Sequence, residues 1–279
     1  MAEITATTRI ALIGGGKMGE AIMGGWIACA SGSAAVLTKD NFIVANPGAE
    51  RRAFLSERYG VACVADLTQV QAADVVVLAV KPQVMMGVLD TIATMAWAPT
   101  ALFISIAAGL TTTRLQEALP AGARLVRVMP NTPLLVGAGA SAVCAGSQAS
   151  ADEGALVCDL FACLGQAHLV DEASMDAVGA LSGSGPAYVA ALVEHLRDAG
   201  VAQGLNAALA ESLAIQTVCG TAQLLRETQQ TPEQVRVSVC SPGGSTLAAL
   251  AAMDKAGIAA AYGAGVAAAV KRSKELGSC

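Results

Sequence analysis

The chain has 279 residues, a net charge of −5 and a pI near 5.1, and this acidic balance argues against nucleic acid or an anionic membrane surface as its partner. It is 54% hydrophobic, 14% charged and 3% aromatic, so we expect cores of Ala, Val, Leu and Ile and a small-molecule ligand. The first residues, MAEITATT, lack the basic and apolar regions of an export signal, and no apolar run reaches the roughly 18 residues that span a bilayer. A cytoplasmic location is therefore expected.

Neither a metal site nor a disulfide framework is predicted. The eight cysteines are scattered without a CxxC pair, and the chain has only two histidines, His168 and His195. We expect most of the cysteines to be buried as small apolar side chains.

Short apolar runs alternate with helical segments through the first half of the chain. The runs have the continuous apolar character of buried parallel strands, and they cover residues 9–14, 42–46, 74–80, 101–107 and 124–129. Residues 17–30, 49–59, 82–96 and 112–119 have helical length and pattern. The alternation predicts an α/β fold, a Rossmann-type doubly wound parallel sheet.

The strand signal stops near residue 170. Residues 140–146 and 166–171 are expected to add edge strands with a helix between them, and the chain then becomes rich in Ala and Leu at helical spacing. We therefore predict a dinucleotide-binding domain over residues 1–168 and an all-α domain over 169–279, with the boundary between 165 and 172.

A glycine-rich turn follows the first strand. Gly14, Gly16 and Gly19 form G-x-G-x-x-G at the start of a helix, where glycines allow a tight turn, a close approach to pyrophosphate and helix-strand packing. A plain tight turn is the alternative, but the position after a first strand favours a dinucleotide site.

The second strand ends at Asn46, where a site that prefers NAD usually has an acidic residue for the ribose 2′-hydroxyl. Arg51 and Arg52 follow, and arginine suits a 2′-phosphate because it can form paired hydrogen bonds. The alternative is that these charges are the solvated start of a helix. NADPH is favoured as the cofactor, and NADH stays open.

Three loops follow the carboxyl ends of later strands, where ligands bind in sheets of this type. They should border the nicotinamide end of the cofactor through Val80, Lys81, Pro82, Ala107, Ala108, Met129, Pro130 and Asn131.

Residues 239–250, VCSPGGSTLAAL, join two glycines and several hydroxyls to the start of a predicted helix. A helix N-terminus with Ser241, Ser245 and Thr246 beside it suits a small carboxylate, and ordinary helix capping is the alternative. No lysine occurs between Lys81 and Lys255, and neither histidine is supported as a base. Reduction of a C=N bond therefore fits better than oxidation of an alcohol, which needs a base.

GGGKMGEAI, LAVKPQ, SIAAG, RVMPNTP, LSGSGPAYV and VCSPGGST, in this order and spacing, resemble the pyrroline-5-carboxylate reductase family over nearly the whole chain. The resemblance implies hydride transfer from NAD(P)H to the C=N bond of 1-pyrroline-5-carboxylate, which gives L-proline in the last step of proline synthesis. It also implies a homodimer formed by the helical domain, with larger rings of dimers in many members.

Site residues follow from the resemblance. The cofactor would be held by Gly14, Gly15, Gly16, Lys17, Met18, Gly19, Asn46, Arg51, Ala79, Val80, Lys81, Pro82, Ser105, Ile106, Ala107, Ala108, Met129, Pro130, Asn131 and Thr132. The substrate would contact Glu172, Val239, Ser241, Gly243, Gly244, Ser245 and Thr246, with Thr246 as the catalytic hydroxyl at the ring nitrogen.

The sequence departs from the family pattern at Lys17, where Asn is frequent, and at Ser245, where Thr or Ala is common. Three alternatives to this function stay open: a β-hydroxyacid dehydrogenase, a silent nucleotide-sensing relative and a reductase of another cyclic imine. The first would need a lysine between Ser182 and Arg226, and none is present. The second would not need a carboxylate pocket. Cofactor preference, ring size of the substrate, oligomer size and feedback by proline are not given by the sequence.

Overall fold

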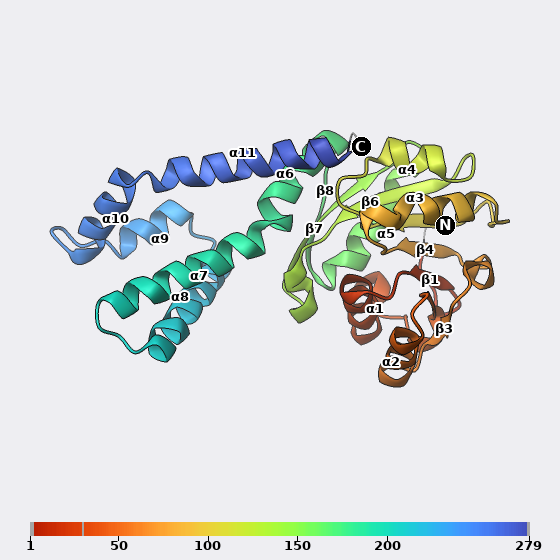
Figure 1. Cartoon of the computed structure of the whole chain (residues 1–279), viewed down its shortest axis with the longest axis horizontal. Coiled ribbons are helices and arrows are strands. Elements are labelled where there is room, and N and C mark those ends of the chain that lie inside the picture. The colour runs from red at the N-terminus through yellow and green to blue at the C-terminus, as the bar shows by residue number, and fades with distance from the viewer. Residues whose placement is uncertain (1–2, 30, 278–279) are drawn as a thin grey trace. The chain divides into compact units, whose positions relative to one another are not determined.

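The computed structural model describes residues 3–29 and 31–277. These residues form two compact units, which are described separately (Figure 1). The first contains the described residues of 1–184 and 269–279, and the second contains residues 185–268. The domain boundary expected between residues 168 and 169 stays a prediction.

An eight-stranded sheet of the described residues forms the centre of the first unit, in the order β3-β2-β1-β4-β5-β6-β7-β8. The strands are β1 (Ile10–Ile13), β2 (Phe42–Ala45), β3 (Ala62–Val64), β4 (Val75–Leu78), β5 (Leu102–Ser105), β6 (Arg124–Met129), β7 (Gly139–Ala145) and β8 (Gly165–Leu169). All neighbours pair in parallel except β6 and β7. The predicted α/β fold is confirmed, and strands form near both of the last two predicted positions. Only β8 lies at a sheet edge, because β7 pairs with β6 on one side and β8 on the other, so the edge position expected for β7 is wrong.

Each face of the sheet has its own apolar core, because successive side chains along a strand point to opposite faces. Ile10 and Leu12 of β1 lie in one cluster, and Ala11 and Ile13 lie in the other. The first cluster is covered by α1 (Lys17–Ala28), α2 (Ala49–Tyr59) and α5 (Ala151–Ala162). The second is covered by α3 (Pro82–Ala93) and α4 (Thr112–Ala118).

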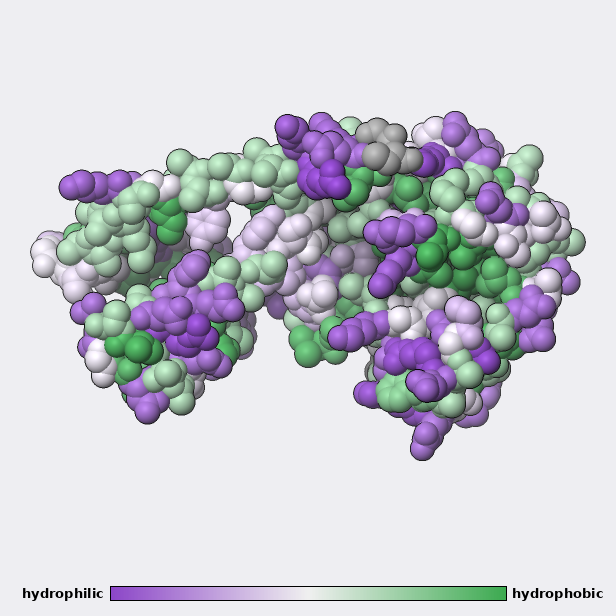
Figure 2. All heavy atoms as spheres, viewed as in Figure 1, coloured by the Kyte–Doolittle hydropathy of each residue, from purple (hydrophilic) through white to green (hydrophobic). Residues whose placement is uncertain are grey.

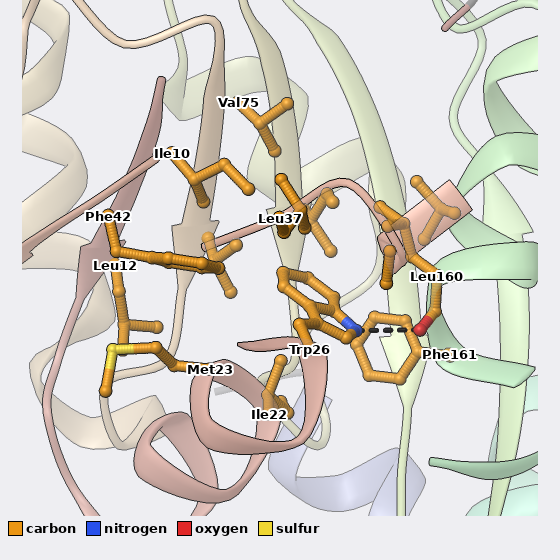
Figure 3. Close-up of a cluster of buried hydrophobic side chains, with 14 of the residues drawn as sticks. Ile10, Leu12, Ile22, Met23, Trp26, Leu37, Phe42, Val75, Leu160 and Phe161 are labelled. Carbon is orange, nitrogen blue, oxygen red and sulfur yellow. Dashed lines mark hydrogen bonds between the residues drawn. The ribbon is translucent and has the colours of Figure 1, made fainter. Parts of the chain in front are cut away.

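Trp26 shows how tightly the first cluster packs. Its side chain is 1% exposed, its Nε1 donates to the carbonyl oxygen of Leu160 at 2.7 Å, and its ring meets Phe161 edge to face at 5.5 Å (Figure 3). The contact joins α1 to α5, which follow strands at different places in the sheet. It thereby fixes the helix whose first turn follows the glycine-rich loop.

Local differences from the expected elements are small. Strand β3 was not expected, because its three residues carry only a brief apolar signal. Helix α2 has the predicted bounds, α1 ends at Ala28, and Ala30, the predicted helix end, lies outside the described residues. Short helical turns occur at Gly32–Ala34, Lys39–Asn41, Leu67–Val70, Thr132–Val136 and Glu172–Ser174, and α6 (Met175–Val178) continues into a π-helical segment, Gly179–Gly183.

The second unit is helical. It contains α7 (Gly185–Ala202), α8 (Ala207–Thr228), α9 (Pro232–Ser238), α10 (Ser245–Lys255) and the first part of α11 (Ile258–Gly277). Of residues 185–268, only Ala210, Ala214 and Val235 are buried, and green apolar side chains lie on the surface of these helices (Figure 2). Among the described residues, no helix is long and apolar enough to cross a membrane.

Candidate cofactor and substrate site

The carboxyl ends of β1, β2, β4 and β5 meet at one edge of the sheet. The N–H of Gly14 donates to Ala45 O at 2.9 Å, that of Ala79 to Ile13 O at 2.8 Å, and that of Ile106 to Leu78 O at 3.2 Å. The adjacent strands β1 and β4 mark the point where the strand order reverses. Crevices for ligands form at such points in open α/β sheets.

The glycines of the first loop have different surroundings. Gly14 has a φ of +102°, and a Cβ there would lie 2.7 Å from the carbonyl oxygen of Ala79, so a side chain is excluded. A Cβ on Gly19 would collide with the carbonyl oxygen of Gly14. Gly16 is different: apart from its own neighbours in the chain, no atom of the described residues lies within 4 Å of the position its Cβ would take. The loop is therefore closed on the sheet side and open at Gly16.

The open side faces the start of α1. The first hydrogen bond of the helix joins Glu20 N–H to Gly16 O at 2.9 Å, so the amides of Lys17, Met18 and Gly19 precede it and are available to an acceptor. Amides at a helix N-terminus, next to a glycine with room beside it, fit the pyrophosphate of a dinucleotide. Lys17 is exposed and adds a positive charge at this end.

Asn46 and the two arginines hold the neighbouring turn together. Asn46 Oδ1 accepts from Gly15 N–H at 3.3 Å, and Arg52 Nη1 donates to Asn46 O at 2.8 Å and to Pro47 O at 2.6 Å. Arg51 Nε donates to Gly15 O, and its Nη2 pairs with Glu20. Much of the hydrogen-bonding capacity that the sequence suggested for a 2′-phosphate is therefore used inside the protein.

Glu20 is the acidic partner in this arrangement and was not singled out in the sequence. Its Oε1 accepts from the hydroxyl of Tyr59 at 2.9 Å, besides the pair with Arg51. Burial favours the protonated carboxyl, but the hydrogen bonds from Arg51 and Tyr59 outweigh it and lower the pKa of Glu20. The carboxylate thus links α1 to α2 beside the glycine-rich loop.

The loops after β4 and β5 have exposed and buried members. Lys81 is the N-cap of α3, and Pro82 is its first residue, which suits proline because that position needs no intrahelical N–H bond. Ser105 is fully buried and its Oγ accepts from Ala107 N–H at 3.3 Å, whereas Ala108 is exposed. The buried serine therefore shapes the backbone that presents Ala108.

At the end of β6, Asn131 has an internal role. It is 8% exposed, its Oδ1 accepts from Ala140 N–H at 2.8 Å, and its Nδ2 donates to Ser182 O at 3.0 Å. Met129 is half-buried. Its Cε lies close to Gly183: a Cβ added to Gly183 would be 2.6 Å from this atom. Within the first unit, the predicted nicotinamide loop therefore packs against the SGSGP motif.

Arg127 and Glu172 form an ion pair that the sequence interpretation did not anticipate. Arg127 is 3% exposed, its Nη1 pairs with Glu172, and its Nε has no hydrogen-bond partner among the described residues. Cys144 Sγ donates to Glu172 at 3.5 Å, and burial, with the nearby Glu172 charge, raises the pKa of this thiol to about 11. The sequence did contain a signal for this ion pair, namely the charged Arg127 inside the apolar run RLVRVM. The predicted contact of Glu172 with substrate stays a prediction.

The predicted substrate loop lies in the helical unit. Helix α10 starts at Ser245 with Gly244 as its N-cap, and Gly243 has a φ of +72°. Gly244 N–H donates to Ser241 O at 2.9 Å, and the first bond of the helix joins Ala248 N–H to Gly244 O at 3.4 Å. The hydroxyls of Ser245 and Thr246 therefore lie in the first turn, beside amides that precede the helical bonding, and this arrangement suits a carboxylate.

Two protein-family models match the chain. The model for pyrroline-5-carboxylate reductase dimerisation matches residues 172–276, and that for NADP oxidoreductase, coenzyme F420-dependent, matches residues 9–109. The pyrroline-5-carboxylate reductase of Synechocystis sp. is 42% identical over 270 residues, which cover 96% of this chain and 98% of the relative. The chain belongs to the pyrroline-5-carboxylate reductase family. The Escherichia coli reductase is 36% identical over 96% of this chain and 98% of its own length.

Solved structures of pyrroline-5-carboxylate reductases have the same fold. That from Coxiella burnetii has a TM-score of 0.86 at 36% identity, with 97% of this chain and 98% of the other covered. That from Plasmodium falciparum, which has NADP bound, has a TM-score of 0.85 at 30% identity and covers 98% of this chain and 99% of its own. This member of the pyrroline-5-carboxylate reductase family is an NAD(P)-type oxidoreductase.

Proposed function

We propose that this chain reduces 1-pyrroline-5-carboxylate to L-proline with NADPH as hydride donor, as a homodimer in the cytoplasm. Family membership supports the reaction, and the observation that carries the two binding roles is the pair of glycine-containing helix starts, at α1 and at α10. The first suits the cofactor's pyrophosphate, and the second suits the substrate's carboxylate.

The residues at the sheet edge fit a dinucleotide. Gly16 leaves room beside its backbone, and the amides that follow it in α1 precede the first helical bond. When bound, the cofactor supplies a hydride. The chain itself would bind the pyrophosphate at these amides and place the nicotinamide end along the loops that contain Ala108 and Met129.

Thr246 is proposed as the hydroxyl at the ring nitrogen. It is the second residue of α10 and is half-buried, so the backbone beside it can hold the carboxylate while its side chain bonds the neighbouring nitrogen. Fixing both groups turns one face of the C=N bond toward the donor, and orientation of this kind contributes strongly to rate. The imine nitrogen carries its proton when the substrate binds, so no separate acid is assigned.

Thr246→Ala tests this assignment. We expect kcat to fall by about 100-fold, because the C=N bond is then no longer held in the orientation for hydride transfer, with the KM for NADPH within about twofold. The matched variant, Ser245→Ala, should raise the KM for the pyrroline carboxylate more than it lowers kcat, because Ser245 would contact the carboxylate. Steady-state kinetics separate the two. Unchanged kcat in Thr246→Ala would remove this residue from the mechanism.

NADPH is proposed over NADH because Asn46 replaces an acidic residue that would repel a 2′-phosphate. A relative with 30% identity has NADP bound. Arg51 and Arg52 both hydrogen-bond within the protein, so the preference rests on Asn46 and not on these two side chains. The test is to measure kcat/KM for NADPH and for NADH, with pyrroline-5-carboxylate and its six-membered homologue as substrates. A ratio of the NADPH value to the NADH value at or below one would contradict the NADPH preference.

The homodimer is proposed from the helical unit. A groove of about 470 Å³ lies between α7 and the α10–α11 region, and its walls are apolar and include Tyr188, Leu192, Leu196, Met253 and Tyr262. The dimerisation model of the family covers these residues. A second copy of the chain would cover the groove, and rings of dimers stay a prediction that the particle mass can test.

A further inference from the structure

We infer that the last residues of α11, 269–277, position the cofactor loop that follows β5. We call these residues the α11 tail. Helix α11 starts in the helical unit, but its tail belongs to the sheet-containing unit. The inference rests on the proposed role of Ala107 and Ala108 at the nicotinamide end of the cofactor.

The first contact is with Gly109, directly after Ala108. Gly109 has a φ of +78°, and a Cβ there would lie 3.5 Å from Leu276 Cβ. A Cβ on Gly277 would in turn lie 2.6 Å from the carbonyl oxygen of Gly109, a distance that side chains do not tolerate. Gly277 therefore has no room for a side chain, and Gly109 favours glycine because of its positive φ.

Arg114 of α4 secures the same end of the helix. Its Nη1 donates to the carbonyl oxygen of Gly277 at 3.2 Å. A cation at a helix C-terminus satisfies a carbonyl that has no helical partner and interacts favourably with the helix dipole. Helix α4 follows the β5 loop in the chain, so the tail approaches this segment at Gly109 and is hydrogen-bonded to it at Arg114.

The second contact is with α6. Ser273 Oγ donates to Asp176 Oδ1 at 2.6 Å. The partly buried residues of the tail are Ala269, Val270, Ser273 and Gly277, a spacing that puts them on one side of the helix. This side faces the sheet-containing unit along about two turns.

The two contacts flank a cavity of about 310 Å³ within the first unit. Its walls include Ala108 from the β5 loop, Met129 from the end of β6, Met175 from α6, and Ser273 and Leu276 from the tail. Ala108 and Met129 are two of the loop residues expected beside the nicotinamide. The tail therefore contacts both the β5 loop and α6, which form walls of this cavity. The distance between these walls sets the width of this part of the proposed cofactor site.

A loop that spends less time in its binding conformation weakens apparent affinity in proportion to the lost fraction. Displacing Gly109 should therefore weaken NADPH binding while the substrate loop of the helical unit is unchanged. The tail acts through the loop, so its residues are positioning residues and need not touch the cofactor.

Gly277→Ala is the direct test, with Gly87→Ala as the matched control. Gly87 is an exposed helical glycine of α3 with no atom of the described residues within 4 Å of its would-be Cβ. We expect Gly277→Ala to raise the Kd for NADPH about tenfold, which corresponds to about 1.4 kcal/mol, and to leave the KM for pyrroline carboxylate within about twofold. Gly87→Ala should bind NADPH as the unchanged protein does. Fluorescence titration without substrate gives the Kd.

Ser273 gives a second test with a built-in rescue. Ser273→Ala loses the bond to Asp176 and should raise the Kd for NADPH about threefold, whereas Ser273→Thr retains a hydroxyl and should restore it. Thermal unfolding is recorded for every variant, because a tail with only a structural role would lower Tm without changing nucleotide affinity below the transition.

An unchanged Kd for NADPH in Gly277→Ala overturns the inference, as does equal weakening by Gly87→Ala. Loss of Tm without loss of affinity also overturns it. Failure of the proposed function would give a different result. In that case the unchanged protein would not oxidise NADPH in the presence of pyrroline-5-carboxylate, whether or not the variants bind NADPH.

Discussion

The sheet-containing unit and the helical unit bury their apolar side chains to very different extents. In the first, strands such as β1 and β4 are buried on both faces beneath helices of the same chain. In the second, Leu209, Leu213 and Ile215 are each about half exposed, at 50, 51 and 51%. One unit thus completes its core within a single chain, and the other does not.

This difference in burial indicates that the helical unit lacks a partner surface to cover its apolar side chains. Monomeric soluble proteins rarely expose large continuous apolar patches, and such patches usually mark interfaces. The residues concerned lie within the part of the chain that matches the family's dimerisation model. We therefore expect the stability of the helices to depend on protein concentration, and that of the sheet to depend mainly on its own packing.

Leu196→Glu should have the largest effect, because it tests the incomplete core directly. Leu196 lies in the α7 groove and is 36% exposed in the single chain. A carboxylate buried there without a partner costs several kcal/mol, so we expect dimerisation at least 100-fold weaker. Light scattering at micromolar concentration should give 27.9 kDa for the variant and at least twice that mass for the unchanged protein.

Val36→Glu is the matched control, since Val36 is 44% exposed on the sheet-containing unit. It should keep the mass of the unchanged protein. A dimeric Leu196→Glu, or an unchanged protein with the mass of one chain, would contradict the comparison.

Trp26→Ala should have the next largest effect and tests the complete core. Removing this ring leaves a cavity and takes one hydrogen bond from the Leu160 carbonyl, and truncation of a buried aromatic residue typically costs about 3–5 kcal/mol of unfolding free energy. Urea unfolding monitored on the sheet-containing unit measures it. Val84→Ala, at a position 53% exposed, should cost at most about 0.5 kcal/mol. Similar losses in both variants would contradict a core centred on Trp26.

The order of elements was predictable from the sequence, because buried parallel strands are continuous apolar runs. Strand β4 is Val75–Leu78, and its four residues are all buried. Strand β3 was missed, since one exposed and two half-buried residues at a sheet edge have almost no apolar pattern. The antiparallel direction of β7 was also beyond the sequence, because it depends on the turn at Thr132–Val136 and not on composition.

For the site, the sequence identified residues by local motif and missed those that act across the fold. Gly14 and Gly19 were recognisable because their spacing has a backbone reason. Glu20, Arg127 and Ser273 were not, since their partners Arg51, Glu172 and Asp176 lie 31, 45 and 97 positions away. Arg51 shows the same limit: its charge was evident, but its bond to Gly15 was not.

Glu20→Gln should have the smallest effect, and it separates polar from apolar support in the sheet-containing unit. The folded protein lowers the pKa of Glu20, so the ionised carboxylate contributes stability at all pH values above the unfolded pKa, about 4.3. That contribution is lost as pH falls through the lower folded pKa. The variant should be less stable by about 1 kcal/mol at pH 7, and the difference should shrink from about pH 5 downward.

The measurement is urea unfolding from pH 7 to pH 3, with Glu57→Gln as control, since Glu57 is an exposed residue of α2. Trp26→Ala should lose stability by a similar amount at every pH, because its loss is apolar. The Glu20→Gln difference should disappear in acid, because both proteins then lack the negative charge that Arg51 and Tyr59 bond. A Glu20→Gln difference that stays constant down to pH 3 would show that the side chain's shape, and not its charge, joins α1 to α2.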